Sequence, residues 1–356
     1  MEREEEIKNI EEEIRRTKYN KATQYHIGQL KAKLARLKEG IEKKKTGKGK
    51  ALSLRKSGDA TVLLVGFPSV GKSTLLNRIT SAESKTGDYE FTTLDAIPGV
   101  MEYNSAHIQI LDIPGVVSGA SSGRGRGKEI LSFVRNADLI LIMIDKPGQL
   151  RVIGRELYDS GFRLNEEPPN VIIKKTNRGG IKVSSTVKLK HLDKKMVQVV
   201  VNERGMHNAE VLIRENVTLE RLIDATSKNR VYVKSIVIYN KVDLLSKDRR
   251  KSIPKEFLQV SSMKGEGIGE LKERVWKRLE LMRVYMKKIG KLPDMEKPLI
   301  TGKGSKVSDV AESIHKDFER NLEYARIWGP SARFDGQKVG GERVLRDKDI
   351  VELHME

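Results

Sequence analysis

A run of eight residues has the types and spacing of a phosphate-binding loop. An apolar stretch at residues 61–65 precedes it and a helical pattern at residues 73–79 follows it, which is the context that the motif G-x-x-x-x-G-K-[ST] requires. Its glycines let backbone N–H groups approach a phosphate, and the helix start adds a partial positive charge. We expect Lys72 to bridge the β- and γ-phosphates and Ser73 to bind magnesium. The residues predicted to bind here are Gly66, Phe67, Pro68, Ser69, Val70, Gly71, Lys72, Ser73 and Thr74.

A second element has the residue types for binding a metal ion and a terminal phosphate. Asp112 follows the apolar run at residues 107–111, and Gly115 comes three residues later. An aspartate at the end of a buried strand can hold magnesium through a water molecule, and the glycine N–H can then contact the γ-phosphate. The residues of this element predicted to contact the nucleotide are Asp112, Ile113, Pro114, Gly115 and Val116.

Two threonines lie between these elements, in the sequence FTTL. A threonine hydroxyl in such a loop can bind the metal when a triphosphate is present, and we prefer Thr93 to Thr92 for this role. The alternative, to which we give less weight, is that both are ordinary loop threonines. The predicted metal ligands are Ser73, Thr93 and Asp112, and the predicted catalytic residues are Lys72, Thr93 and Gly115.

A third sequence element predicts that the bound nucleotide carries guanine. The sequence NKVD ends the apolar run at residues 235–239. The carboxylate of Asp243 can accept hydrogen bonds from guanine N1 and N2, while the amide of Asn240 supports the base edge and the stem of Lys241 lies along it. Adenine lacks these donors, and an unpaired carboxylate would cost about 1–3 kcal/mol. The predicted base-binding residues are Asn240, Lys241, Val242 and Asp243.

The short sequence SSM follows a further apolar run at residues 257–260. A backbone N–H at this place can meet guanine O6, although serines are also common in plain turns. The predicted contacts are Ser261, Ser262 and Met263.

These motifs follow short, continuous apolar runs that alternate with helical patterns. Such runs are typical of strands buried on both faces of a parallel sheet, and ligands collect at the carboxyl ends of those strands. The fold class expected is therefore α/β, with a P-loop domain built from a mostly parallel sheet flanked by helices.

A folded insert is expected between the second and third motifs, because Asp112 and Asn240 are separated by far more residues than one strand and one helix need. The sequences NVIIKK, GGIKVSST and MVQVVVNE predict strands, and VTLERLIDATS predicts a helix, so the insert is expected to be α+β.

The two ends of the chain predict further domains. Isoleucines and leucines at helical spacing predict an N-terminal helical hairpin, which can pack on the main domain or form a coiled coil for a partner. A basic linker follows it, and a helical stripe from Val307 to Phe318 precedes strand patterns near the C-terminus. The expected domains are 1–56 (hairpin and linker), 57–161 and 228–290 (the two parts of the P-loop domain), 162–227 (insert) and 291–356 (C-terminal domain).

Composition limits the partners and the compartment. The net charge of +19 favours a polyanionic partner, with RNA preferred, although charge alone identifies no partner and nothing indicates DNA specificity. The chain has no cysteine, which excludes disulfides and thiolate chemistry and fits a reducing compartment. No apolar run is long enough to span a membrane and the acidic N-terminus lacks a secretory signal, so we expect a cytoplasmic protein.

Taken in order, the sequences GFPSVGKSTLLN, FTTL, DIPGVVSGASSGRGRG, NKVD and SSM resemble the Obg branch of translation-factor GTPases, and within it the developmentally regulated GTP-binding (DRG) family. The resemblance covers essentially the whole chain. It implies a small-GTPase-type G domain, an insert similar to a ribosomal-protein fold and a C-terminal β-grasp (TGS) domain. It also implies GTP hydrolysis with magnesium, a ribosome or ribosomal RNA as partner, and an accessory protein that binds the TGS domain.

One position departs from the common GTPase pattern. Val116 stands where many GTPases have a glutamine that orients the attacking water, so intrinsic hydrolysis should be slow and stimulated by a partner, a monovalent cation or a rearranged loop. Arg124 and Arg126 of the same chain can supply positive charge to the hydrolysis reaction, or they can contact phosphate, RNA or solvent. Some relatives use potassium beside a P-loop asparagine; Ser69 stands there, which leaves potassium dependence open.

Three functions fit these features. The first is a ribosome- or RNA-associated GTPase that acts as a switch in translation. The second is a ribosome-assembly GTPase of the Obg type, and the third is a binding scaffold whose nucleotide is structural. The sequence does not separate them.

Overall fold

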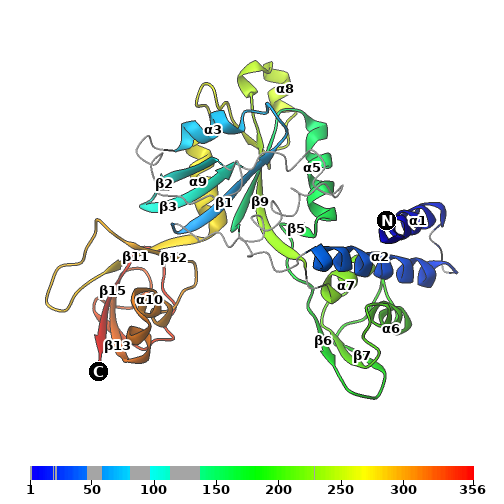
Figure 1. Cartoon of the computed structure of the whole chain (residues 1–356). Helices are drawn as coiled ribbons and strands as arrows, with labels where there is room; N and C mark the ends of the chain where they lie inside the picture. The colour runs from blue at the N-terminus through cyan, green and yellow to red at the C-terminus, as the bar shows by residue number, and fades with distance from the viewer. Residues whose placement is uncertain are drawn as a thin grey trace. The chain divides into compact units, whose positions relative to one another are not determined.

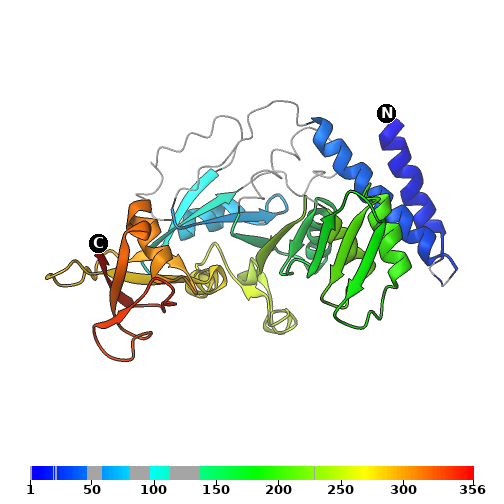
Figure 2. The same ribbon diagram turned by 90° about the horizontal axis from the view of Figure 1, so that it is seen from below.

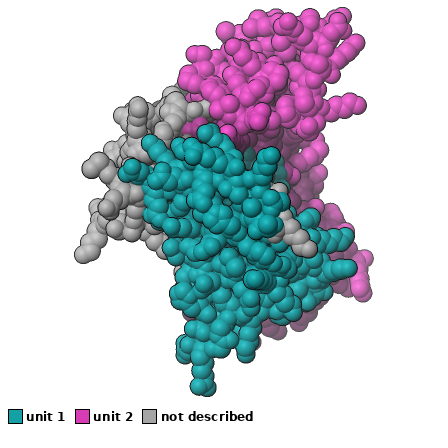
Figure 3. Space-filling model, turned by 90° about the vertical axis from the view of Figure 1, so that its right-hand side faces the viewer, with its two compact units in different colours: residues 1–51, 161–232 teal, residues 52–160, 233–356 magenta. Residues whose placement is uncertain are grey.

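The computed structural model describes residues 2–18, 20, 22–45, 58–80, 97–112, 137–227 and 229–356. These residues form two compact units, 1–51 with 161–232 and 52–160 with 233–356, which are coloured in Figure 3. No helix in the described ranges combines the length and apolar character that crossing a bilayer requires. The predicted residues that lie outside the described ranges are Thr92, Thr93, Ile113, Pro114, Gly115, Val116, Arg124 and Arg126.

The second unit contains the sheet that carries the nucleotide motifs. Six of its seven strands lie in the order β10-β9-β4-β1-β3-β2, and the seventh, β5, pairs with β9; β1, β2, β3, β5 and β9 are labelled in Figure 1. Along the six-strand order, only the pairing of β2 with β3 is antiparallel. The strand bounds are β1 Ala60–Gly66, β2 Ile97–Tyr103, β3 Ala106–Asp112, β4 Leu139–Ile144, β5 Phe162–Leu164, β9 Val231–Tyr239 and β10 Leu258–Gln259. The mostly parallel sheet is confirmed, and its antiparallel edge strand β2 was not predicted.

Helices flank this sheet because its strands are apolar on both faces. Leu75 of α3 and Val275 of α9 share one core with Val62 and Leu64 of β1, whereas α5 packs against β4. The connecting elements are α3 Lys72–Ile79, α5 Pro147–Asp159, η3 Val242–Leu244, α8 Lys247–Lys251 and α9 Ile268–Leu279.

The C-terminal part of the second unit is a five-stranded sheet in the order β12-β11-β15-β13-β14, with α10 packed on one face. Its core contains Val284, Val310, Ile327 and Val351. The elements are β11 Leu281–Met286, β12 Leu299–Gly302, α10 Val307–Ile314, α11 Lys316–Arg320, β13 Leu322–Trp328, β14 Gln337–Val339 and β15 Asp349–Met355. Because β11 belongs to this sheet, the sheet starts before residue 291, where we expected this domain to begin.

The first unit joins the N-terminal hairpin to the insert. The insert has a three-stranded sheet, β6-β8-β7, covered by α6 and α7. Its elements are β6 Val171–Lys175, β7 Ile181–Ser185, α6 Lys194–Glu203, β8 Ala209–Ile213 and α7 Leu219–Thr226. The sequence MVQVVVNE lies in α6, so the strand predicted there is wrong: Asp193 caps a helix whose buried residues include Val197 and Val201, one helical turn apart.

The hairpin consists of α1 (Glu2–Arg16) and α2 (Gln24–Lys45), and α2 lies along the insert (Figure 2). Ala32 and Ala35 of α2 belong to the same core as Met196. A Cβ on Gly28 would lie only 2.5 Å from the sulfur of Met196, so the glycine allows close packing. The hairpin therefore packs on the insert, whereas we had expected the main domain or a separate coiled coil.

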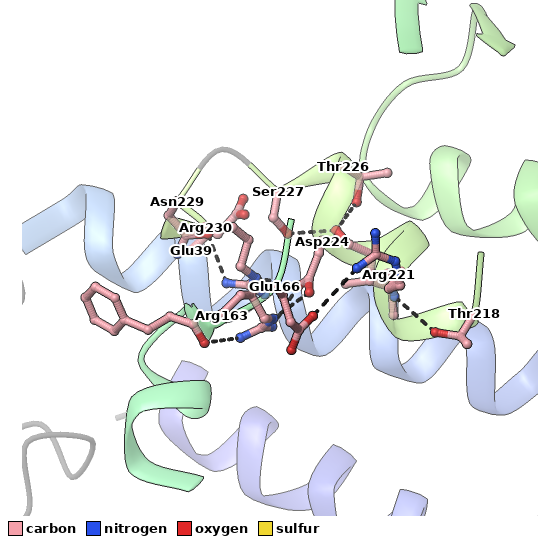
Figure 4. A network of polar contacts seen from close by, with 12 residues as sticks. Glu39, Arg163, Glu166, Thr218, Arg221, Asp224, Thr226, Ser227, Asn229 and Arg230 are labelled. Atoms are coloured by element: carbon pink, nitrogen blue, oxygen red, sulfur yellow. Dashed lines mark hydrogen bonds and ion pairs between the residues drawn. The ribbon is translucent and has the colours of Figure 1, made fainter. Parts of the chain in front are cut away.

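A buried ionic network holds the ends of the insert together (Figure 4). Asp224 on α7 accepts two hydrogen bonds from Arg163, at 2.6 and 2.7 Å, and one from Arg230 at 2.6 Å. Arg163 and Asp224 are both buried. Because Arg163 follows the entry to the insert and Arg230 precedes its exit, one carboxylate fixes both crossings of the chain.

Replacement of this carboxylate by an amide should loosen the first unit. We expect Asp224→Asn to lower its free energy of unfolding by about 3 kcal/mol, because two arginines lose their buried counter-charge. Both tryptophans, Trp276 and Trp328, lie in the second unit, so hydrogen exchange read by mass spectrometry is the suitable measurement.

Peptides of β6, α6 and α7 should exchange faster in this variant, whereas those of the five-stranded sheet should not change. Glu210→Gln, at an exposed position of β8, is the matched control. Equal exchange in wild type and Asp224→Asn would contradict the proposed role of the network.

Candidate functional site

The loop between β1 and α3 has the backbone conformation of a phosphate cradle. Ser69 and Gly71 have positive φ angles of 59° and 101°, which turns successive N–H groups inward. A Cβ on Gly71 would lie 2.5 Å from the amide nitrogen of Asn240, and one on Gly66 would lie 2.6 Å from the carbonyl oxygen of Met143. Close neighbours therefore require glycine at both positions, and the backbone conformation also requires it at Gly71.

Lys72 spans this loop. Its Nζ donates hydrogen bonds to the carbonyl oxygens of Gly66 and Phe67, both at 3.2 Å. The ammonium group thus lies over the first half of the loop, where it can transfer its hydrogen bonds to phosphate oxygens.

Ser73 and Asp112 meet at the end of the sheet. The Ser73 hydroxyl donates to Oδ2 of Asp112 at 3.3 Å. Asp112 is buried, and its Oδ1 has no hydrogen-bond partner among the described residues. Burial raises the pKa of Asp112, although Lys72 and the Ser73 hydroxyl partly oppose the shift.

This pair fits magnesium. The ion prefers carboxylate and hydroxyl oxygens, and an orphaned carboxylate oxygen beside a serine hydroxyl supplies both. Ser73 and Asp112 would hold the ion, which neutralises phosphate charge when bound. The third predicted ligand, Thr93, lies outside the described residues.

The side chain of Asn240 connects two loops of the site. Its Nδ2 donates to the carbonyl oxygen of Val70 at 2.8 Å, and its Oδ1 accepts from the backbone N–H of Ser262 at 3.0 Å and from the Ser262 hydroxyl at 2.9 Å. Both ends of this buried amide are therefore used within the protein. Asn240 positions the phosphate loop and the 261–263 loop relative to each other, in addition to its predicted place at the base edge.

Lys241 adds a third connection, which involves a residue that the sequence analysis missed. Its Nζ donates to the carbonyl oxygen of Ser69 at 2.8 Å and to Oδ2 of Asp145 at 2.7 Å. Burial opposes ionisation of Asp145, but hydrogen bonds from Lys241 and Gln149 outweigh it, so the pKa of Asp145 is lowered. Asp145 directly follows the apolar strand β4, and this position was a signal that could have found it.

The predicted base-reading residues come together at the edge of the sheet. A hydrogen bond with Ser261 is the main cause that lowers the pKa of Asp243, so its carboxylate is ionised at neutral pH. Ser261 and Ser262 are buried, and Arg78 donates to the carbonyl oxygens of Ser262 and Met263. The described members of all the motifs thus line one end of the sheet, and their individual contacts to nucleotide stay predictions.

Family models match almost the whole chain. The model described as 50S ribosome-binding GTPase matches residues 61–175, the C-terminal region of the same MMR_HSR1 domain matches residues 178–281, and the TGS domain matches residues 282–355. Together with the phosphate loop and the sheet order, these matches define a P-loop GTPase with a C-terminal TGS domain.

Full-length relatives identify the family. The chain is 50% identical to a GTP-binding protein of Methanocaldococcus jannaschii, covering 98% of this chain and 92% of the relative. It is 45% identical to GTP-binding protein 1 of Schizosaccharomyces pombe and 41% identical to human developmentally-regulated GTP-binding protein 2, covering 98% of each chain. The chain belongs to the developmentally regulated GTP-binding protein family, as its motifs predicted, and it is a GTP-binding GTPase.

Asp243 should decide which base is bound. We expect Asp243→Asn to weaken GDP binding by about a hundredfold or more, because two hydrogen bonds to a charged acceptor are lost. Xanthosine diphosphate should bind the variant better than GDP does, since the new amide can donate to the 2-oxo group of xanthine. Calorimetric titration of both nucleotides measures this reversal. Asp248→Asn, at an exposed position of α8, is the control, and an unchanged preference for GDP would exclude Asp243 from base recognition.

Asp112 should make the stability of the metal-free protein depend on pH. A carboxyl whose folded pKa is raised contributes stability below its unfolded pKa, and this contribution is lost as the pH rises through the folded pKa. Asp112→Asn should therefore stabilise the nucleotide-free, magnesium-free protein at pH 7, and the gain should vanish in acid, where both side chains are neutral. Urea unfolding at several pH values measures the difference. A gain that is constant with pH would contradict this assignment, and the same variant should bind magnesium nucleotide more weakly.

Proposed function

We propose that this GTPase associates with the ribosome or its RNA and acts as a switch in translation. The observation that carries the proposal is a basic segment of the insert, defined by eight exposed residues between positions 174 and 195. The only acidic residue in that stretch is Asp193, and none of the eight lies within ion-pair distance of a described acidic side chain. The residues are Lys174, Lys175, Arg178, Lys182, Lys188, Lys190, Lys194 and Lys195.

Charge and family support this partner. Exposed basic side chains gain free energy by displacing the counterions of a polyphosphate. The net charge of +19 adds long-range attraction. The model that matches residues 61–175 is described as a 50S ribosome-binding GTPase, which points to the same class of partner.

Hydrolysis in this proposal is in-line attack by water on the γ-phosphate. Lys72 stabilises the charge on the β- and γ-phosphate oxygens, while Asn240 and Lys241 hold the phosphate loop in place. No general base is assigned, and Val116 takes the position of the usual water-orienting glutamine. We therefore propose slow intrinsic turnover that the partner accelerates, together with a cytoplasmic location and an accessory protein on the TGS domain.

The proposal is tested by GTP turnover with purified ribosomes over a series of salt concentrations. We expect stimulation of about tenfold or more at low salt, which fades as salt competes for the phosphates. Lys72→Ala should abolish turnover, and ATP should not be hydrolysed. Unchanged basal turnover with ribosomes would contradict the proposal and point to another activator or to the scaffold, which should show no loss of GTP with or without ribosomes.

A charge variant separates the role of the basic segment from that of the active site. Lys174→Gln combined with Lys182→Gln should reduce ribosome stimulation severalfold and leave basal turnover unchanged, whereas Lys338→Gln on the TGS domain is the matched control. A preference for immature subunits over translating ribosomes would favour the assembly GTPase. The same assay in potassium and in sodium salts tests the monovalent-cation dependence that Ser69 leaves open.

A further inference from the structure

The C-terminal domain contains a cavity of about 440 Å³. It lies where the turn after β13 meets the segment that precedes β15. The lining residues are Ser331, Glu342, Arg343, Val344 and Arg346. None of them belongs to the nucleotide motifs.

Asp349 holds the wall of this cavity in one conformation. This carboxylate is fully buried, and it accepts the backbone N–H of Ser331 at 3.0 Å and that of Arg346 at 2.7 Å. Gly329 has a φ of 114°, and a Cβ there would lie 2.9 Å from Oδ1 of Asp349. The two segments that form the wall are therefore fixed to one buried side chain before any ligand arrives.

The wall carries hydrogen-bonding groups that the protein leaves unused. The hydroxyl of Ser331, a residue only 7% exposed, has no partner among the described residues, and neither does the buried Nε of Arg343. Arg343 donates through Nη2 to the carbonyl oxygen of Ser331, and Arg346 donates through Nη1 to that of Pro330 at 3.2 Å. Both guanidinium groups are thus held at the wall, each with further N–H groups available.

The charge of the cavity is positive. Glu342 is its one acidic lining residue, and this carboxylate is paired with Lys306. Neither Arg343 nor Arg346 forms an ion pair with an acidic side chain in the described part of the chain. A ligand that fits must therefore be anionic and must offer several acceptor oxygens.

We propose that this cavity is a phosphate-binding site, formed by Ser331, Arg343 and Arg346. A phosphate oxygen accepts from the accessible guanidinium N–H groups of Arg343 and Arg346. The Ser331 hydroxyl and the Arg343 Nε are covered in the free protein, and they gain a partner when the Arg343 side chain turns toward the bound phosphate. The phosphate comes from an RNA chain or from free phosphate. Only the RNA source rests on the function proposed above.

Calorimetric titration of the full chain tests the site. The protein is first saturated with GDP and magnesium, so that the P-loop is blocked. The three titrants are a 5′-phosphorylated oligoribonucleotide, the same oligoribonucleotide with a 5′-hydroxyl, and inorganic phosphate.

Three variants probe the cavity and one lies outside it. Ser331→Ala removes one hydrogen bond and should weaken binding about threefold to tenfold, whereas Arg346→Gln removes a charge and should weaken it about tenfold or more. Glu342→Gln frees Lys306 and should tighten binding about threefold. Arg326→Gln, which removes an exposed arginine of β13, is the matched control and should have little effect.

Each outcome is informative about the source of the phosphate. Tighter binding of the 5′-phosphorylated oligoribonucleotide identifies an RNA terminus, and equal binding of both RNAs identifies backbone phosphates. If inorganic phosphate binds and neither RNA does, the ligand is free phosphate. That result would support the site even if ribosomes failed to stimulate GTP turnover. The proposal is overturned if no titrant binds, or if Ser331→Ala and Arg346→Gln change binding no more than Arg326→Gln does.

Discussion

The geometry of the nucleotide site depends on one buried amide. Asn240 uses its nitrogen for the phosphate loop and its oxygen for the 261–263 loop, so two segments far apart in sequence share one rigid group. A shorter side chain would leave the Val70 carbonyl and the Ser262 N–H buried without partners. Gly71 follows from the same constraint, because a Cβ at that position would collide with the Asn240 amide. The motif residues are therefore constrained by each other as much as by the ligand.

The sequence was sufficient to predict those parts of the site in which a short motif directly follows a strand. The phosphate loop, Asp112, the NKVD residues and SSM all follow continuous apolar runs, and parallel strands bring their carboxyl ends to one edge. The sequence was not sufficient to predict the hydrogen bonds that connect one motif with another. Nothing local to Asp145 indicates that its partner is Lys241, ninety-six positions away, and the internal bonds of Asn240 likewise depend on tertiary contacts.

The insert shows why local patterns fail outside the central sheet. Val199, Val200 and Val201 are β-branched and favour a strand by propensity, yet they lie in α6 because Asp193 caps a helix whose buried side faces α2 and the small sheet. The strand β8, which pairs with both β6 and β7, went unrecognised. Its sequence AEVLI is short and offers little pattern to distinguish it from a loop. The packing of α2, from the N-terminal end of the chain, decided α6, whereas pairing with two strands of the insert decided β8.

An insert in the middle of a nucleotide-binding domain requires the chain to leave and re-enter at fixed places. Arg163 and Arg230 stand near these two crossings, and both bind the single carboxylate of Asp224. The planar arginines satisfy both oxygens of this carboxylate. Both crossings therefore depend on Asp224, because loss of its charge would leave two arginines without their counter-charge. The hairpin adds Glu39, which pairs with Arg204 of the insert at 2.6 Å. The N-terminal helices and the insert are thus held by charge as well as by their shared apolar core, which explains why they form one compact unit although more than a hundred residues separate them in the sequence.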